Sequence, residues 1–200
     1  MPCCKNPGTP EISRDPNSLR RIAVSLLCAA SILPWGTSNA AGLAVKTAQL
    51  TLVDEVYNLD AGFDIALSDA VQDAIGKGIP IYFVIEFQVT RSRLFWYDEK
   101  ITEVKQNIRL SYHALTRRYQ LSAAGLHRNF ASLPEAVDYL GDLHDWPVLE
   151  RQRLEQRENY SASVRIELDR SKLPKPLQVN ALGSEDWELA SDWYQWSLTP

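Results

Sequence analysis

Cysteine and histidine are both scarce in this 200-residue sequence, with three residues of each. Cys3, Cys4 and Cys28 all precede residue 41. Residues 41–200 therefore contain no thiolate nucleophile, no cysteine ligand for a metal and no disulfide bond. A segment of this length can bury a sufficient apolar core without covalent staples.

Long apolar runs are also lacking. The apolar run at residues 22–33, IAVSLLCAASIL, has 12 residues, whereas a membrane-spanning helix needs about 20. An uncleaved membrane anchor is the alternative interpretation of this run, and its short length disfavours that alternative.

The flanks of the run have the order of a secretory signal. The basic pair Arg20-Arg21 precedes it, and Pro34-Trp35-Gly36 ends it. Ser38-Asn39-Ala40 then supplies small residues where a signal peptidase cleaves. The sequence therefore predicts a signal peptide over residues 1–40, with cleavage near Ala40, and a single globular domain over residues 41–200.

A domain that is exported without disulfides is more typical of the bacterial periplasm than of small eukaryotic secreted modules, which tend to be disulfide-dense. The prediction for localisation is therefore periplasmic. Four of the 21 basic and two of the 25 acidic residues precede residue 41, so the remainder carries 17 basic and 23 acidic residues, a formal charge of −6. This balance argues against nucleic acid or an anionic membrane surface as a partner.

Motifs of common chemistry are absent as well. The sequence has no G-x-S-x-G elbow, no H-E-x-x-H and no glycine-rich nucleotide fingerprint. His113, His127 and His144 are far apart in the sequence, and the neighbouring pair His144-Asp145 is the one arrangement that could orient an imidazole. We therefore expect a non-enzymatic domain without a metal or other cofactor. The alternative is a hydrolase whose carboxylates converge only in three dimensions.

Alternating apolar residues predict a mainly β structure. The clearest pattern covers residues 79–97, where every second residue from Ile81 to Val89 is apolar. A return strand with a similar pattern follows the polar turn at residues 98–100 and makes a long hairpin. Further strands are predicted over residues 45–53, over 56–67 with a turn at 60–62, in a short hairpin at 111–121, and over 161–169 and 187–198.

Two short helices are predicted. One begins after Ser68, a favourable N-cap, and ends at Gly76. The other begins at the capping box Ser132-Leu133-Pro134-Glu135. Leu173-Pro174-Lys175-Pro176 is predicted to break regular structure. The expected fold is mainly β (α+β), an antiparallel sandwich or half-open barrel with two short helices.

Two aromatic-rich segments are candidate binding surfaces. Arginine beside aromatic rings favours recognition of carboxylates, phosphates or proteins, and large exposed rings favour a partner or ligand. In each segment the alternative is that the rings belong to the core. The candidate residues are Arg91, Arg93, Phe95, Trp96, Tyr97, Trp193 and Trp196.

Several blocks of sequence, in order, resemble a known bacterial family, the domain-of-unknown-function family numbered 4390. The resemblance covers about residues 43–198. The blocks are GIPIYF at 78–83, RLFW at 93–96, LSYHALTR at 110–117, FASLPEA at 130–136, DWPV at 145–148 and LPKPLQVN at 173–180.

The resemblance implies an uncharacterised exported protein of proteobacteria, without an assigned activity or catalytic residues. An association of the family's genes with those of a nitrogen-regulation-type sensor histidine kinase implies a membrane or periplasmic protein as partner. The leading hypothesis is thus a non-enzymatic protein-binding or regulatory module. The alternatives are a periplasmic carrier of an apolar or lipid-like ligand and, third, a hydrolase.

Overall fold

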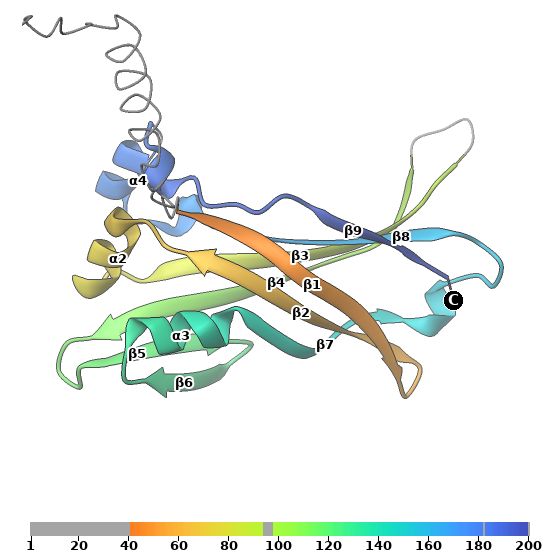
Figure 1. Cartoon of the computed structure of the whole chain (residues 1–200), viewed down its shortest axis with the longest axis horizontal. Helices are drawn as coiled ribbons and strands as arrows, with labels where there is room; N and C mark the ends of the chain where they lie inside the picture. The colour runs from red at the N-terminus through yellow and green to blue at the C-terminus, as the bar shows by residue number, and fades with distance from the viewer. Residues whose placement is uncertain (1–40, 94–97, 182, 200) are drawn as a thin grey trace, which may run out of the picture. The chain divides into compact units, whose positions relative to one another are not determined.

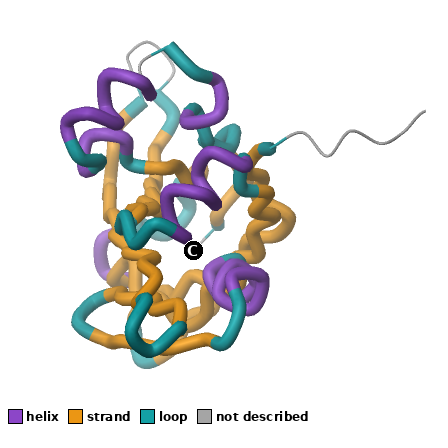
Figure 2. Tube along the Cα trace, turned by 90° about the vertical axis from the view of Figure 1, so that its left-hand side faces the viewer, coloured by secondary structure: helices purple, strands orange, loops and turns teal. Residues whose placement is uncertain are grey.

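The computed structural model describes residues 41–93, 98–181 and 183–199, which form two antiparallel sheets and several short helices (Figure 1). Strands, drawn in orange in Figure 2, make up most of this part of the chain. The predicted mainly β fold is confirmed, and the two separate antiparallel sheets are consistent with a sandwich. The side chains of residues 180 and 182 lie outside the description.

The smaller sheet has the strand order β1-β2-β7 and the larger sheet has the order β6-β5-β4-β3-β8-β9. The strands are β1 Gly42–Val53, β2 Val56–Ala66, β3 Ile81–Arg91, β4 Glu99–His113, β5 Arg118–Ala123, β6 Leu126–Phe130, β7 Asp142–Glu150, β8 Tyr160–Leu168 and β9 Tyr194–Leu198. The helices are α2 Asp69–Gly76, α3 Leu133–Leu140 and α4 Lys175–Ala181, with 3₁₀ turns η1 Arg151–Arg153, η2 Arg170–Lys172 and η3 Glu185–Trp187.

The central strand of the larger sheet, β3, supplies the middle of the core. Its alternating residues from Ile81 to Val89 are fully buried, as the sequence predicts, and β4 and β8 flank it on both sides. Each large apolar side chain buried in this way contributes about 1.5–3 kcal/mol to folding. Leu59 of β2 joins the same core from the smaller sheet.

Both predicted helix starts are confirmed. The Ser68 side chain accepts a hydrogen bond from the Val71 amide at 3.3 Å and so caps α2. The Ser132 side chain accepts one from the Glu135 amide at 3.4 Å and caps α3. Each cap satisfies an amide that has no partner inside its own helix.

Three local predictions are wrong. Residues 60–62 do not turn, because β2 continues through them and is paired with β1 and β7 on its two sides. Residues 173–176 lead into a third helix, α4, whose first turn tolerates Pro176 because the amides there need no helical partner. Residues 187–198 are a strand only from Tyr194, since Trp187 ends a 3₁₀ turn.

The strand predicted over residues 79–97 is shorter than expected. β3 ends at Arg91, and residues 94–97 lie outside the described part of the chain. Strands β6 and β7 were not predicted, because their short segments have no clean alternation. No helix in the described ranges is long and apolar enough to cross a lipid bilayer.

Candidate functional site

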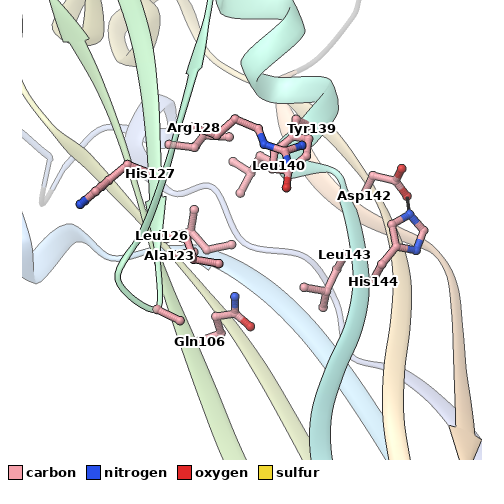
Figure 3. Close-up of a pocket in the computed structure, with 13 residues that line it drawn as sticks. Gln106, Ala123, Leu126, His127, Arg128, Tyr139, Leu140, Asp142, Leu143 and His144 are labelled. Carbon is pink, nitrogen blue, oxygen red and sulfur yellow. Dashed lines mark ion pairs between the residues drawn. The ribbon is translucent and has the colours of Figure 1, made fainter. Parts of the chain in front are cut away.

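A cavity of about 420 Å³ lies where the chain passes from one sheet to the other (Figure 3). β6 is an outer strand of the larger sheet, β7 is an outer strand of the smaller one, and α3 connects them. The cavity therefore has β4, β5 and β6 on one side and α3 and β7 on the other. Its lining residues are Gln106, Ile108, Leu121, Ala123, Ala124, Leu126, His127, Arg128, Tyr139, Leu140, Asp142, Leu143 and His144.

The wall of the cavity is mostly aliphatic. Leu140 and Leu143 are buried on the side of α3 and β7, and both point inward in Figure 3. Leu126 of β6 faces them and is 77% exposed. An apolar side chain of this size that is left open to solvent at a cavity marks a place where a ligand could cover it.

Strand alternation separates the polar residues of β6. His127 points away from the cavity in Figure 3 and forms a 2.7 Å hydrogen bond with the Ser122 hydroxyl. Arg128, one residue further, points across the cavity toward α3. Its guanidinium carbon lies 4.5 Å from the centre of the Tyr139 ring, a cation–π contact. Arg128 is thus the basic side chain that β6 presents to the cavity.

Gln106 lies at the other end of the cavity. Its side-chain oxygen is buried and has no hydrogen-bond partner among the described residues. A buried amide without a partner is costly. Its carboxamide can therefore gain free energy from a water or ligand group that enters the cavity.

A second pocket, of about 540 Å³, lies beside β1, β2 and β7 and is more polar. His144 forms ion pairs there with Asp142, at 2.9 Å from Nε2, and with Asp60, at 3.7 Å from Nδ1. The hydrogen bond to Asp142 raises the pKa of His144 above its ordinary value, and the charge of Asp60 adds to this effect. Its lining residues are Thr47, Ala48, Gln49, Asp60, Ala61, Gly62, Asp142, His144 and Tyr194.

The arrangement His144-Asp145, which in the sequence could orient an imidazole, does not form in this structure: His144 is an exposed residue shortly after α3, and its partner is not Asp145. Asp145 has φ +52° in a bulge of β7, and its backbone amide donates a 3.0 Å hydrogen bond to Asp60. The partner that orients His144 is Asp142, which lies two residues earlier on the strand. Among the residues described, no cluster of three or more His, Cys, Asp or Glu side chains is arranged to hold a metal ion.

A comparison with family models matches residues 40–197 to "Domain of unknown function (DUF4390)". This chain belongs to the DUF4390 family. No curated protein and no solved structure matches it significantly. The resemblance inferred from the sequence blocks is confirmed, and the family description names no activity for the DUF4390 domain.

The two arginines predicted as a binding site lie at the end of β3 and are paired with acids. Arg91 Nη2 lies 2.6 Å from a Glu99 carboxylate oxygen, and Arg91 Nη1 lies 3.4 Å from Glu155. Arg93 forms an ion pair with the same oxygen of Glu99. Their hydrogen bonds, first that of Arg91, lower the pKa of Glu99. Both guanidinium groups are therefore paired with carboxylates, Glu99 on β4 and Glu155 in the segment before β8.

The predicted aromatic residues are only partly covered by the description, since Phe95, Trp96 and Tyr97 lie outside it. Trp196 is half-buried, with its ring centre 6.2 Å from that of Phe87. Trp193 is 40% exposed, and the Arg165 guanidinium lies 4.7 Å from its ring centre. Trp196 thus packs on the core, whereas the ring of Trp193 is partly exposed to solvent.

The structure does not bring the arginines and Trp193 together. Arg91 of β3 is paired in register with Tyr160 of β8. The ring of Trp193 contacts Arg165, which lies five residues further along β8. Five residues of a β-strand span about 17 Å. The cavity residues Gln106, Arg128 and Tyr139 were missed in the sequence because no motif joins residues of a strand, a hairpin and a helix.

Proposed function

We propose that this DUF4390 protein is an exported, periplasmic, non-enzymatic binding module that holds a small apolar ligand in the cavity between β4–β6 and α3–β7. The observation that carries the proposal is the cavity itself. Its volume of about 420 Å³ lies within the range of about 300–1,000 Å³ typical of ligand pockets. Leu126, Leu140 and Leu143 supply aliphatic surface on both sides.

Export supports a role in carrying or sensing rather than in metabolism that needs nucleotide cofactors. The basic pair Arg20-Arg21, the apolar run and the small residues before Ala41 support a cleaved leader. An apolar ligand in an aqueous compartment gains free energy from each methylene group that it buries, about 0.8 kcal/mol. An open aliphatic cavity is suited to that task.

The test is titration of the purified protein with the uncharged fluorescent probe N-phenyl-1-naphthylamine. We expect saturable binding with one site per chain. Ala123→Phe fills the cavity from β5 and should weaken binding at least tenfold. Gln120→Phe is the matched control, because Gln120 lies on the same strand and faces the opposite side of the sheet. Wild-type protein without saturable binding would contradict the proposal.

A second candidate function is the docking of a membrane or periplasmic protein at β9. It is favoured by the exposed rings of Trp193 and Tyr194 beside this outer strand, 40% and 38% exposed. A crosslinkable amino acid at Trp193, activated in intact cells, should capture a partner that mass spectrometry then identifies. The same crosslinkable amino acid placed at Leu126 shows whether a captured partner binds at β9 or at the cavity. Absence of a specific adduct at Trp193 would argue against docking at β9.

A further inference from the structure

We infer that the ligand of the cavity is an amphiphile with an acidic head, of the chemical class of a medium-chain carboxylic acid, and that Arg128 binds its carboxylate. The inference rests on the proposed function, because it specifies the ligand of the same cavity. Two observations support it: Arg128 has no acidic partner among the described residues, and the lining of the cavity changes from basic to apolar along its length.

Arg128 has no acidic partner in the described part of the chain. Its contact is the face of the Tyr139 ring at 4.5 Å, and the ion pairs formed by other residues do not include it. The ring holds one face of the guanidinium but leaves its in-plane N–H donors available. A planar guanidinium binds a carboxylate through two parallel hydrogen bonds.

The acid that lines the cavity does not cancel this charge. Asp142 forms a 2.9 Å hydrogen bond with His144, whose pKa is raised by that bond. In Figure 3 these two side chains lie on the far side of β7 from the inward-pointing Leu143. Arg128 therefore supplies the uncompensated charge that faces the cavity.

The cavity has a cationic end, at Arg128, and an apolar middle. In Figure 3, Arg128 and Tyr139 lie at the α3 end, Leu126 and Leu143 follow, and Gln106 lies at the opposite end. A ligand with its head on Arg128 would place its tail along the leucines. A neutral hydrocarbon would leave the guanidinium unused, and a fully polar anion would leave the leucines exposed.

The experiment compares decanoate with 1-decanol by isothermal titration of the purified protein at pH 7.5. The two probes share a ten-carbon chain and differ in the charge of the head. We expect decanoate to bind at least tenfold more tightly than decanol. Arg128→Gln should reduce that ratio to about one, because a charged hydrogen-bonded contact is lost, whereas Arg128→Lys should retain part of it.

Arg118→Gln is the matched control, because it removes an exposed arginine at the start of β5, outside the cavity lining. It should leave the decanoate preference unchanged, and circular dichroism should show that both Gln variants are folded. Equal binding of decanoate and decanol overturns this inference while the proposed function stands. Binding of neither probe, nor of N-phenyl-1-naphthylamine, overturns the proposed function as well. A preference that survives Arg128→Gln shows that Arg128 does not bind the head.

Discussion

Arg165 donates a 2.7 Å hydrogen bond from Nε to a carboxylate oxygen of Glu86, and its Nη2 lies 2.6 Å from the same oxygen in an ion pair. Lys105 binds the other oxygen. The three residues lie on adjacent strands, in register on β8, β3 and β4. Glu86 is buried, with only 6% of its side chain exposed. A buried carboxylate is thus fully satisfied on the face of the larger sheet opposite the core.

The first prediction concerns the stability of this cluster. Arg165→Met removes the guanidinium that pairs with Glu86 and leaves this buried carboxylate with one partner, Lys105, so we expect a loss of about 2–3 kcal/mol in the free energy of unfolding. Lys105→Met should cost less, about 1–2 kcal/mol, because the guanidinium of Arg165 still pairs with the buried carboxylate of Glu86. Urea unfolding of both variants measures the difference. Equal losses would show that Arg165 has no special part in holding Glu86.

The same cluster predicts how stability depends on pH. Burial alone raises the pKa of Glu86, but the hydrogen bonds from Lys105 and Arg165 outweigh burial and hold the pKa below its ordinary value of 4.5. The stabilisation is therefore complete above pH 4.5 and is lost as the pH falls through the lowered pKa of the folded protein. In Arg165→Met, acid unfolding should begin at a higher pH than in the wild type. Acid titration of both proteins, monitored by circular dichroism, shows which of them begins to unfold at the higher pH.

A second prediction concerns Gly141, the residue that follows α3. Its carbonyl accepts a 2.7 Å hydrogen bond from the Phe63 amide, and a Cβ atom added to it would lie 2.8 Å from the Phe63 carbonyl oxygen. Both groups are backbone, so neither can rotate away. Gly141→Ala should cost about 1–3 kcal/mol, measured by the shift of the urea midpoint.

Gly76 provides the control for that substitution. It ends α2, and a Cβ atom there would have no neighbour within 4 Å. Gly76→Ala should be neutral or slightly stabilising, because alanine favours the helix. If both variants lose stability equally, the cost at position 141 is not steric.

A third prediction concerns the titration of His144. Asp142 raises the pKa of His144 by a hydrogen bond, with a further contribution from the charges of Asp142 and Asp60. Asp142→Asn removes the largest of these effects, so the pKa should fall toward 6.5. NMR titration of the His144 imidazole signal, in the wild type and in Asp142→Asn, measures this change in pKa. An unchanged midpoint would show that Asp142 does not orient the ring in solution.

The sign of the His144 effect follows from the direction of the shift. A raised pKa stabilises the folded state below the unfolded value of about 6.5, and this stabilisation is lost as the pH rises through the folded pKa. The pH dependence of unfolding between neutral and mildly alkaline conditions should therefore be smaller in Asp142→Asn than in the wild type.

The core and the helix starts could be predicted from sequence because their signals are local. The alternation from Ile81 to Val89 requires only that one face be buried, and Ser68 and Ser132 act on amides three residues away. β6 and β7 were missed because neither segment has a clean alternation of buried and exposed residues. The turn expected at residues 60–62 fails for another reason: β7, which is distant in the sequence, pairs with this part of β2 and keeps it extended.

The cavity could not be predicted, since its walls come from segments that no spacing relates. Gln106 and Arg128 have ordinary positions on strands, and their facing the same space depends on the register of β4, β5 and β6. Conversely, Arg91 and Arg93 were singled out for their charge, and the structure shows that both form ion pairs with Glu99. Sequence proximity to aromatic residues does not show whether a cation is already paired.

The last prediction concerns export. If the leader is cleaved near Ala40, the protein isolated from the periplasm begins at Ala41 or Gly42, and it lacks all three cysteines of the sequence. Its mass should therefore be unchanged by a thiol-alkylating reagent after denaturation and reduction. Replacing Ala40 with a bulky residue, Ala40→Phe, should block cleavage because the peptidase site accepts small side chains there. The uncleaved chain would keep Cys3, Cys4 and Cys28 and gain mass on alkylation. A native chain that retains these cysteines would contradict cleavage, whichever compartment holds it.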